Sequence, residues 1–213
     1  MEILFLFFLL FDLTPLLCTG NGLKENPEVA EKLYIQLFKR KRAEQLAGVK
    51  TLQTFPYEKQ YSMTLLMTEK IFTVIQESRA FIESSSYIPG VSEFPTEEKV
   101  RDSLSNILEN TALFSEIILR IPQIGSSVLK TNNNWDVLLQ WSIAFCNQVR
   151  YLLDSSTIKL LHLASQELGH IDKDPNYFNP YAVKNKNLEE ENVIKKKEKK
   201  KIKKGPKLRG YEL

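Results

Sequence analysis

The sequence predicts an all-α protein, a helical bundle of four to five helices over about residues 27–169. Apolar residues recur there at intervals of three and four, which places them along one side of a helix. Residues that favour helix ends stand directly before and after these segments. The chain contains no alternating apolar and polar run bounded by Asn-Gly or Asp-Gly turns, which would indicate a β-hairpin.

The first two predicted helices are separated by Pro56. The first begins after Asn26, with Pro27 in its first turn, and continues to about Thr54. Residues 39–42 give it a charged face, and its apolar positions are Val29, Leu33, Leu37, Leu46 and Val49. The second helix spans about residues 57–82, and its stripe is Tyr61, Leu65, Thr68, Phe72, Ile75 and Ile82.

Three further helices are predicted in the second half of the chain. Thr96 starts the third, which Pro122 ends or kinks; its stripe is Val100, Leu104, Ile107, Thr111, Phe114, Ile118 and Ile121. The triplet at 132–134 caps the fourth, whose apolar positions are Trp135, Leu138, Trp141, Phe145 and Leu152. Asp154 starts a short fifth helix over residues 157–168, which Gly169 closes.

An extended C-terminal strap should follow the last helix. Asp174-Pro175 and Asn179-Pro180 carry the chain across the surface, and three aromatic residues are expected to pin it to the bundle: Tyr177, Phe178 and Tyr181. The bundle and the strap together form one predicted domain at residues 21–183.

Residues 1–20 resemble a cleaved signal peptide. A nine-residue apolar run at 3–11 leads to the small residues Cys18 and Gly20, which suit a signal peptidase site after Gly20. The alternative is a buried N-terminal helix of a cytosolic protein. Asp12 and Pro15 interrupt the apolar segment, and a membrane span needs about 20 apolar residues, so no transmembrane span is predicted.

The last 30 residues form a basic tail. Residues 184–213 hold 12 basic and 5 acidic residues, a formal charge of +7, which leaves −4 on the rest of the chain. This basic run is either a solvated spacer or a segment that binds an acidic partner, anionic lipid or nucleic acid, and the composition favours neither interpretation. No specific nucleic acid is predicted. The chain ends Gly210-Tyr211-Glu212-Leu213, a degenerate match to the Lys-Asp-Glu-Leu signal that a retrieval receptor recognises.

The sequence offers little for catalysis. Glycine-rich phosphate loops, nucleophile elbows and zinc helices are all missing, and His162 and His170 are the only histidines. Cleavage of residues 1–20 would leave Cys146 as the single cysteine, either buried and inert or paired with another chain; its apolar neighbours favour burial. We therefore predict no catalytic residue, no cofactor-binding residue, no metal ligand and no enzymatic activity.

The segment around the two tryptophans supplies the candidate partner-binding residues. Trp135 and Trp141 are six positions apart, about 600° around a helix, so both cannot lie on one narrow core stripe. Either one faces a partner or the strap, or both have a core role, which is the simpler interpretation. Asn147 and Gln148 are weaker candidates, since they could also bridge buried backbone.

Several segments are similar to the coiled-coil domain-containing protein 134 family. They follow one order along residues 30–181, and the lysine-rich tail with Lys204-Gly205-Pro206 is similar too. The segments are Lys41-Arg42-Ala43-Glu44-Gln45-Leu46, Glu109-Asn110-Thr111-Ala112-Leu113-Phe114, Leu119-Arg120-Ile121-Pro122-Gln123-Ile124, Asn134-Trp135-Asp136-Val137-Leu138-Leu139-Gln140-Trp141, Phe145-Cys146-Asn147-Gln148 and Gln166-Glu167-Leu168-Gly169.

This resemblance implies a protein of the endoplasmic reticulum lumen that is partly secreted. It also implies association with endoplasmin, the luminal Hsp90 chaperone, and protection of endoplasmin from excess action of the N-glycosylation machinery. The family has no recognised catalytic residues. This chain departs from it at the end, where the family has Gln-Ser-Glu-Leu in place of Gly210-Tyr211-Glu212-Leu213.

The expected function is therefore that of a non-enzymatic luminal adaptor or chaperone accessory. The main alternative is a secreted, cytokine-like helical protein that modulates cell-surface receptor and MAP kinase signalling. An unrecognised enzyme and nucleic-acid binding through the lysine-rich tail rank below both.

Overall fold

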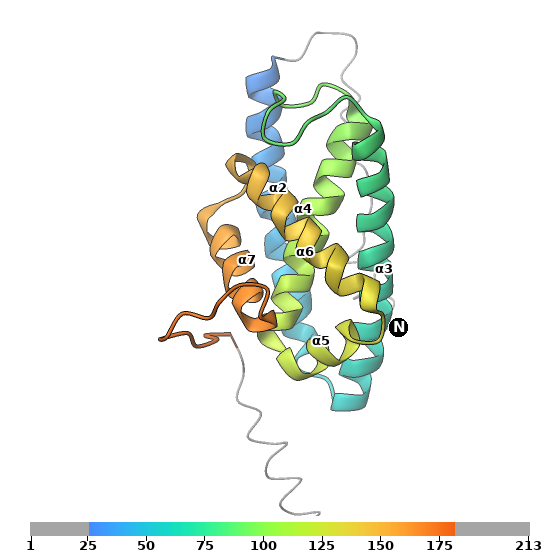
Figure 1. The fold of residues 1–213 in the computed structure, drawn as a ribbon, viewed down its shortest axis with the longest axis vertical. Helices are drawn as coiled ribbons and strands as arrows, with labels where there is room; N and C mark the ends of the chain where they lie inside the picture. Colours follow the sequence, from blue (N-terminus) through green and yellow to red (C-terminus); the bar gives the residue numbers. More distant parts are fainter. Residues whose placement is uncertain (1–25, 182–213) are drawn as a thin grey trace, which may run out of the picture. The chain divides into compact units, whose positions relative to one another are not determined.

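The computed structural model describes residues 26–181, which fold into a helical bundle (Figure 1). Within this range there are six α-helices, one 3₁₀ turn and no strand. The elements are α2 (Pro27–Leu52), α3 (Tyr57–Ser84), α4 (Glu98–Arg120), α5 (Pro122–Leu129), α6 (Asn133–Gln148), η1 (Arg150–Leu152) and α7 (Ser155–Leu168). The all-α prediction is confirmed, with one helix more than the four to five expected.

Helix α4 is the centre of the bundle. Every residue from 110 to 119 is buried, as expected for a helix that is enclosed on all sides, and α4 contacts each of the other five helices. Phe114 meets Phe72 of α3 edge to face, with ring centroids 5.0 Å apart. All seven residues of the predicted α4 stripe are buried, so the periodicity identified the core correctly.

Helix α2 begins as the sequence predicts but buries a different face. The Asn26 side chain accepts a hydrogen bond from the Glu28 backbone N–H at 3.1 Å. Val29 and Leu33, however, are exposed, so the prediction that they form core is wrong. Val49 is buried as predicted, and the helix also buries Phe38, Gln45, Gly48 and Leu52 against α4 and its neighbours. Both faces carry apolar residues, and the packing of α4 decides between them.

The short helix α5 is absent from the prediction, which treated Pro122 only as a terminator. Pro122 ends α4 and also starts α5, because its fixed φ suits a first helical position. Gly125 lets α5 lie close to α4, since a Cβ there would stand 3.0 Å from the Ile118 Cδ1 atom. In the sequence, a glycine within so short a segment indicates a loop. In the structure, Gly125 instead permits close contact between α5 and α4.

The elements after α5 follow the expected caps closely. The Asn132 side chain caps α6 and Asp154 caps α7, while Gly169 takes the left-handed conformation that closes α7 at φ 75°. The α4 start differs slightly: Glu97, and not Thr96, is its N-cap. The predicted fourth helix is also shorter, because α6 stops at Gln148 and the chain continues as η1.

The strap after α7 is fastened by two of its three aromatic residues. The Tyr177 hydroxyl donates to the Glu167 Oε2 atom at 2.5 Å, and the Tyr181 ring lies 5.1 Å from the Arg120 guanidinium. The Asn179 amide donates to the Leu119 carbonyl at 2.7 Å. Phe178 is exposed, so the expectation that it pins the strap is wrong.

The predicted signal peptide at 1–20 and the basic tail at 184–213 lie outside the described residues. In the part of the chain that is described, no helix is both long and apolar enough to cross a membrane.

Candidate protein-binding site

Three of the four candidate partner-binding residues lie on the outward side of α6 or at its border. The helix starts where the Asn132 side chain accepts the Asn134 backbone N–H at 3.0 Å, and it ends at Gln148 because Val149 leaves helical geometry. Its 16 residues rise about 24 Å. In Figure 1, α6 crosses the front of the bundle diagonally, with its C-terminal end near the loop that joins α3 to α4.

Trp135 is the candidate that faces inward. Its ring stacks on Phe72 of α3 at a centroid distance of 5.4 Å and an interplanar angle of 14°, and it packs against the apolar core. Such a contact contributes to packing between α6 and α3. Trp135 is half-buried and lies on the side of α6 that faces α3.

Trp141 lies at the border between the buried and exposed sides of α6. Its ring centroid is 5.3 Å from that of Phe145, and the Arg79 guanidinium carbon lies 4.5 Å from the ring. Arg79 in turn pairs with Glu83 at 2.7 Å. Because the buried face of α6 is wide, both tryptophans contact α3, Trp135 through Phe72 and Trp141 through Arg79.

The outward side of α6 carries a mainly apolar stripe, most of which is exposed. Its members follow steps of four and three residues, the spacing with which a helix meets another helix. Val137 is 65% exposed, Ala144 and Gln148 are exposed, and Trp141 is half-buried. The stripe is Val137, Trp141, Ala144, Gln148 and, in η1, the exposed Tyr151.

The loop at residues 85–97 extends this stripe. Gly90 takes φ +77°, and a Cβ there would lie 2.8 Å from the Gln148 carbonyl oxygen, so the loop backbone lies directly against the end of α6. Next to Gly90 along the loop, Ile88 is exposed and Val91 is 79% exposed. We define the α6 surface as the five stripe residues together with Asn147, Ile88 and Val91.

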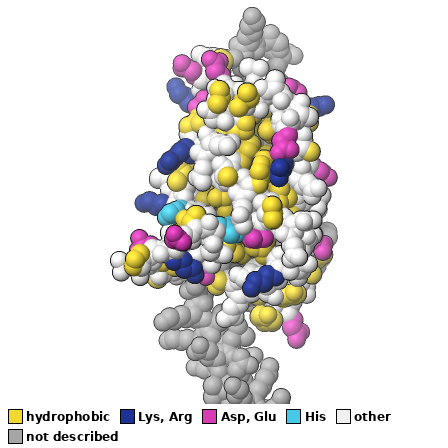
Figure 2. Space-filling view, in the orientation of Figure 1, with side chains coloured by type: hydrophobic (Ala, Val, Ile, Leu, Met, Phe, Trp, Pro, Cys, Tyr) yellow, Lys and Arg dark blue, Asp and Glu magenta, His cyan; other side chains and the backbone are white. Residues whose placement is uncertain are grey.

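The α6 surface is largely uncharged, with charges of opposite sign near its two ends. In Figure 2, which looks onto α6, hydrophobic side chains lie in the middle of the face and charged ones mainly toward its edges. Asp136 pairs with the buried His170 ring at 2.8 Å and stays 44% exposed. Arg150, after the other end of α6, is exposed. Exposed apolar surface rimmed by polar groups is typical of protein-binding sites.

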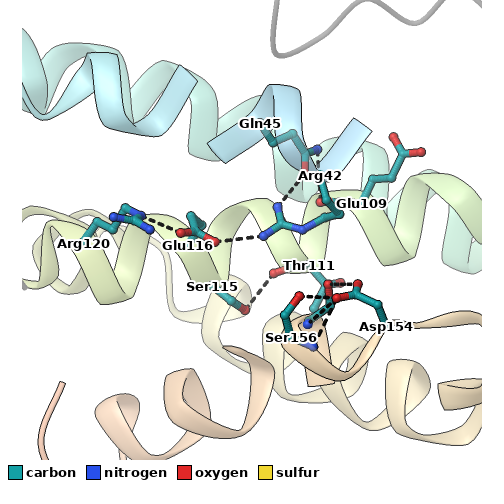
Figure 3. Close-up of polar contacts among 10 residues, drawn as sticks. Arg42, Gln45, Glu109, Thr111, Ser115, Glu116, Arg120, Asp154 and Ser156 are labelled. Atoms are coloured by element: carbon teal, nitrogen blue, oxygen red, sulfur yellow. Dashed lines mark hydrogen bonds and ion pairs between the residues drawn. The ribbon is translucent and has the colours of Figure 1, made fainter. Parts of the chain in front are cut away.

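A second cluster, of buried ionic groups, lies between α2 and α4. Figure 3 shows Glu116 between two guanidinium groups: its Oε2 atom accepts from Arg42 at 2.9 Å and its Oε1 atom from Arg120 at 2.5 Å. The three side chains are 11%, 5% and 13% exposed for Arg42, Glu116 and Arg120. Arg42 also donates to Gln45 at 2.7 Å. The prediction that residues 39–42 form one charged surface is thus wrong for Arg42.

Glu109 lies on the edge of this cluster. Burial raises the pKa of its carboxyl to about 7, against the opposing influence of Lys41 and Arg42. Its backbone carbonyl accepts from the Gln45 amide at 3.3 Å. Two hydrogen bonds of this cluster, from Arg42 to Glu116 and from Gln45 to the Glu109 carbonyl, join α2 to α4, so the cluster holds the two helices together.

Comparison with known proteins identifies the family. The family described as "ERK and JNK pathways, inhibitor" matches residues 21–209. The chain belongs to this family. A coiled-coil domain-containing protein 134 from Xenopus tropicalis is 35% identical over 179 residues, covering 84% of this chain and 78% of the relative. The protein of the same name from Mus musculus is 34% identical over 164 residues, covering 76% and 71%. No solved structure matches the chain.

The resemblance seen in the sequence is therefore confirmed, and the fold shows where its segments meet. Arg42 and Gln45 belong to the first matching segment, Glu109 to the second and Arg120 to the third. These segments come together in the buried ionic cluster. The sequence did not predict the contact between Arg42 and Glu116. The two residues are 74 positions apart on different helices, so the charge pattern along either helix does not indicate that they pair.

The names of this family and its relatives describe an inhibitor and a coiled-coil domain protein, and neither denotes an enzyme. Burial raises the pKa of the Cys146 thiol to about 12, so this cysteine carries no thiolate at neutral pH. Burial of Cys146 is as the sequence predicts. Over residues 26–181, no three His, Cys, Asp or Glu side chains are grouped to hold a metal ion.

Proposed function

We propose that this protein is a non-enzymatic adaptor of the endoplasmic reticulum lumen that binds endoplasmin and limits its excess N-glycosylation. The N-terminal apolar run, the Glu212-Leu213 end and membership of the family support this proposal. The family match also begins at residue 21, directly after the expected cleavage site. The proposed partners are endoplasmin, the N-glycosylation machinery and a retrieval receptor.

The α6 surface is the observation that carries the proposal. It presents Val137 of α6, Tyr151 of η1 and Val91 of the adjoining loop to solvent, and the other side of α6 packs on the core. An exposed apolar stripe on a rigid element is suited to protein recognition, because little conformational entropy is lost on binding. Binding there would limit glycosylation of endoplasmin by one of two routes. It would block access of the N-glycosylation machinery to acceptor asparagines, or it would speed the folding of endoplasmin.

The experiment compares the tagged chain with a variant that lacks residues 210–213. Lumen and medium are separated, and proteins that co-purify from the lumen are identified together with the glycoforms of endoplasmin. We expect the deletion to move the protein to the medium, and loss of the protein to increase glycosylation of endoplasmin. Equal secretion of both forms, with no endoplasmin recovered, would overturn the proposal.

Binding through the α6 surface is tested with a matched pair of variants. Ala144→Arg places a charge in the middle of this surface, and Ala47→Arg makes the same change at an exposed position of α2. We expect only Ala144→Arg to reduce recovery of endoplasmin. If both variants recover endoplasmin equally, the adaptor function stands but a different surface carries it.

A second candidate function is supported by the description of the family. As a secreted helical protein, the chain would act at a cell-surface receptor and reduce ERK and JNK activation. Purified protein added to stimulated cells should then lower phosphorylation of both kinases, with saturable surface binding. No binding and unchanged phosphorylation would remove this candidate.

A further inference from the structure

The α6 surface has features that make it complementary to itself. Its centre is the small Ala144, which allows another backbone to approach closely. Apolar side chains stand exposed at both ends, Val137 at one and Tyr151 with the neighbouring loop at the other. The acidic Asp136 lies near the first end and the basic Arg150 near the second.

We propose that two copies of this chain pair through the α6 surface, with the two α6 helices antiparallel and a twofold axis beside Ala144. Isologous pairing of this kind brings the same patch of both copies together. The molecule that binds the α6 surface is then a second copy of the same chain.

The register follows from placing Ala144 on the axis. Each residue before Ala144 then meets the residue equally far after it in the second copy. Val137 therefore lies opposite Tyr151 of the second copy, and Trp141 lies near Gln148 of the second copy, which shares its side of the helix. The loop, which meets Gln148 at Gly90, then extends Ile88 and Val91 over the Val137 end of the other molecule. The most exposed aliphatic side chains of this face are thereby covered.

The charges at the two ends agree with this register. A twofold axis keeps each flank of one helix against the same flank of the other, so Asp136 of each copy comes near Arg150 of the other. Their distances from Ala144 are eight and six positions, within one helical turn of each other. The opposed helix dipoles also favour an antiparallel pair. A parallel pair would instead place each of these charges level with its like and on the opposite flank of the interface, so neither charge would meet its opposite.

The size of the surface fits a weak contact between two copies. The helix is about 24 Å long, and the loop widens the surface at one end. Because a face one helix wide is smaller than the roughly 800 Å² per partner of a standard interface, the association should be transient and depend on concentration. Pairing would also cover the surface offered to endoplasmin, so that the two would compete; only this competition rests on the proposed function.

The experiment measures the mass of the full secreted chain by light scattering during size-exclusion chromatography and by sedimentation, over a wide concentration range. The buffer contains enough salt to screen the basic tail. We expect a concentration-dependent dimer. Ala144→Arg should be a monomer, whereas Ala47→Arg, the same change on α2, should dimerise like the unmodified chain. Circular dichroism and the thermal midpoint establish that both variants are folded.

A charge exchange tests the antiparallel register. Asp136→Arg and Arg150→Asp should each weaken association about tenfold, since each places like charges at two symmetry-related contacts. The double variant should recover most of this loss. Loss of the His170 contact alone would affect Asp136→Arg but would not be rescued by Arg150→Asp.

Three results would overturn the proposal. They are a monomer at every concentration, a dimer that Ala144→Arg leaves intact, and a double variant no tighter than either single one. None of these measurements involves endoplasmin, so failure of the dimer and failure of the adaptor function are distinguished.

Discussion

Replacing Glu116 by Gln should destabilise the bundle far more than its conservative chemistry suggests. Glu116 accepts from Arg42 at 2.9 Å and from Arg120 at 2.5 Å, and it is 5% exposed. Glutamine keeps the shape but removes the only charge that lies between two guanidinium groups. Both arginines would then stand largely buried and positively charged, without the carboxylate that each of them contacts.

The expected magnitude follows from this burial. Removing one partner of a buried ion pair costs about 3–5 kcal/mol, mainly because it leaves an uncompensated buried charge. For a chain of this size, each kcal/mol lowers the thermal midpoint by roughly 2–4 °C. Urea unfolding of Glu116→Gln should therefore show a lower midpoint with an unchanged slope, because the fold itself is retained.

A matched control separates burial from charge. The Arg79–Glu83 pair has a similar 2.7 Å contact at helical spacing, but its side chains are 36% and 53% exposed. Glu83→Gln should cost less than about 1 kcal/mol, since exposed pairs contribute little. If Glu116→Gln costs no more than Glu83→Gln, the reasoning about the buried cluster is refuted.

Three further predictions concern single sites. Because burial raises the folded pKa of Glu109 to about 7, above its usual 4.5, stability should fall as pH rises between these values; urea midpoints should show this slope, and Glu109→Gln should flatten it. The Cys146 thiol should react with a thiol reagent only at the rate of unfolding. Gly90→Ala should lower the thermal midpoint more than Gly169→Ala, because only at Gly90 does a Cβ meet backbone, the Gln148 oxygen, at 2.8 Å.

Local signals in the sequence predict most of the fold. Asn26, Asn132 and Asp154 each accept backbone N–H groups at a helix start, and Gly169 closes α7 in the left-handed region. These residues act on their immediate neighbours, so the sequence alone is sufficient to place them. Helix α5 was missed because Gly125 weakens the helical pattern, and its stabilising contact with Ile118 comes from tertiary packing.

The candidate site was predictable only in part, for a related reason. Periodicity shows that α6 has apolar residues around much of its circumference, but the positions of α3 and α4 determine which of them are covered. Trp135 stacks on Phe72, which places it on the side of α6 that faces α3. The contribution of Ile88 and Val91 had no sequence signal at all, since the loop reaches α6 through the contact of Gly90 with Gln148.

A substitution at Val137 tests whether the α6 surface binds another molecule or is simply exposed apolar surface without a binding role. Its side chain is 65% exposed, so Val137→Lys should change the free energy of unfolding by less than about 0.5 kcal/mol. If the α6 surface binds another molecule, the same change should weaken that contact, because a lysine there loses apolar contact and must be desolvated. Urea unfolding and sedimentation measured on one preparation separate the two effects. Unchanged stability together with unchanged association and unchanged recovery of endoplasmin would remove Val137 from any interface.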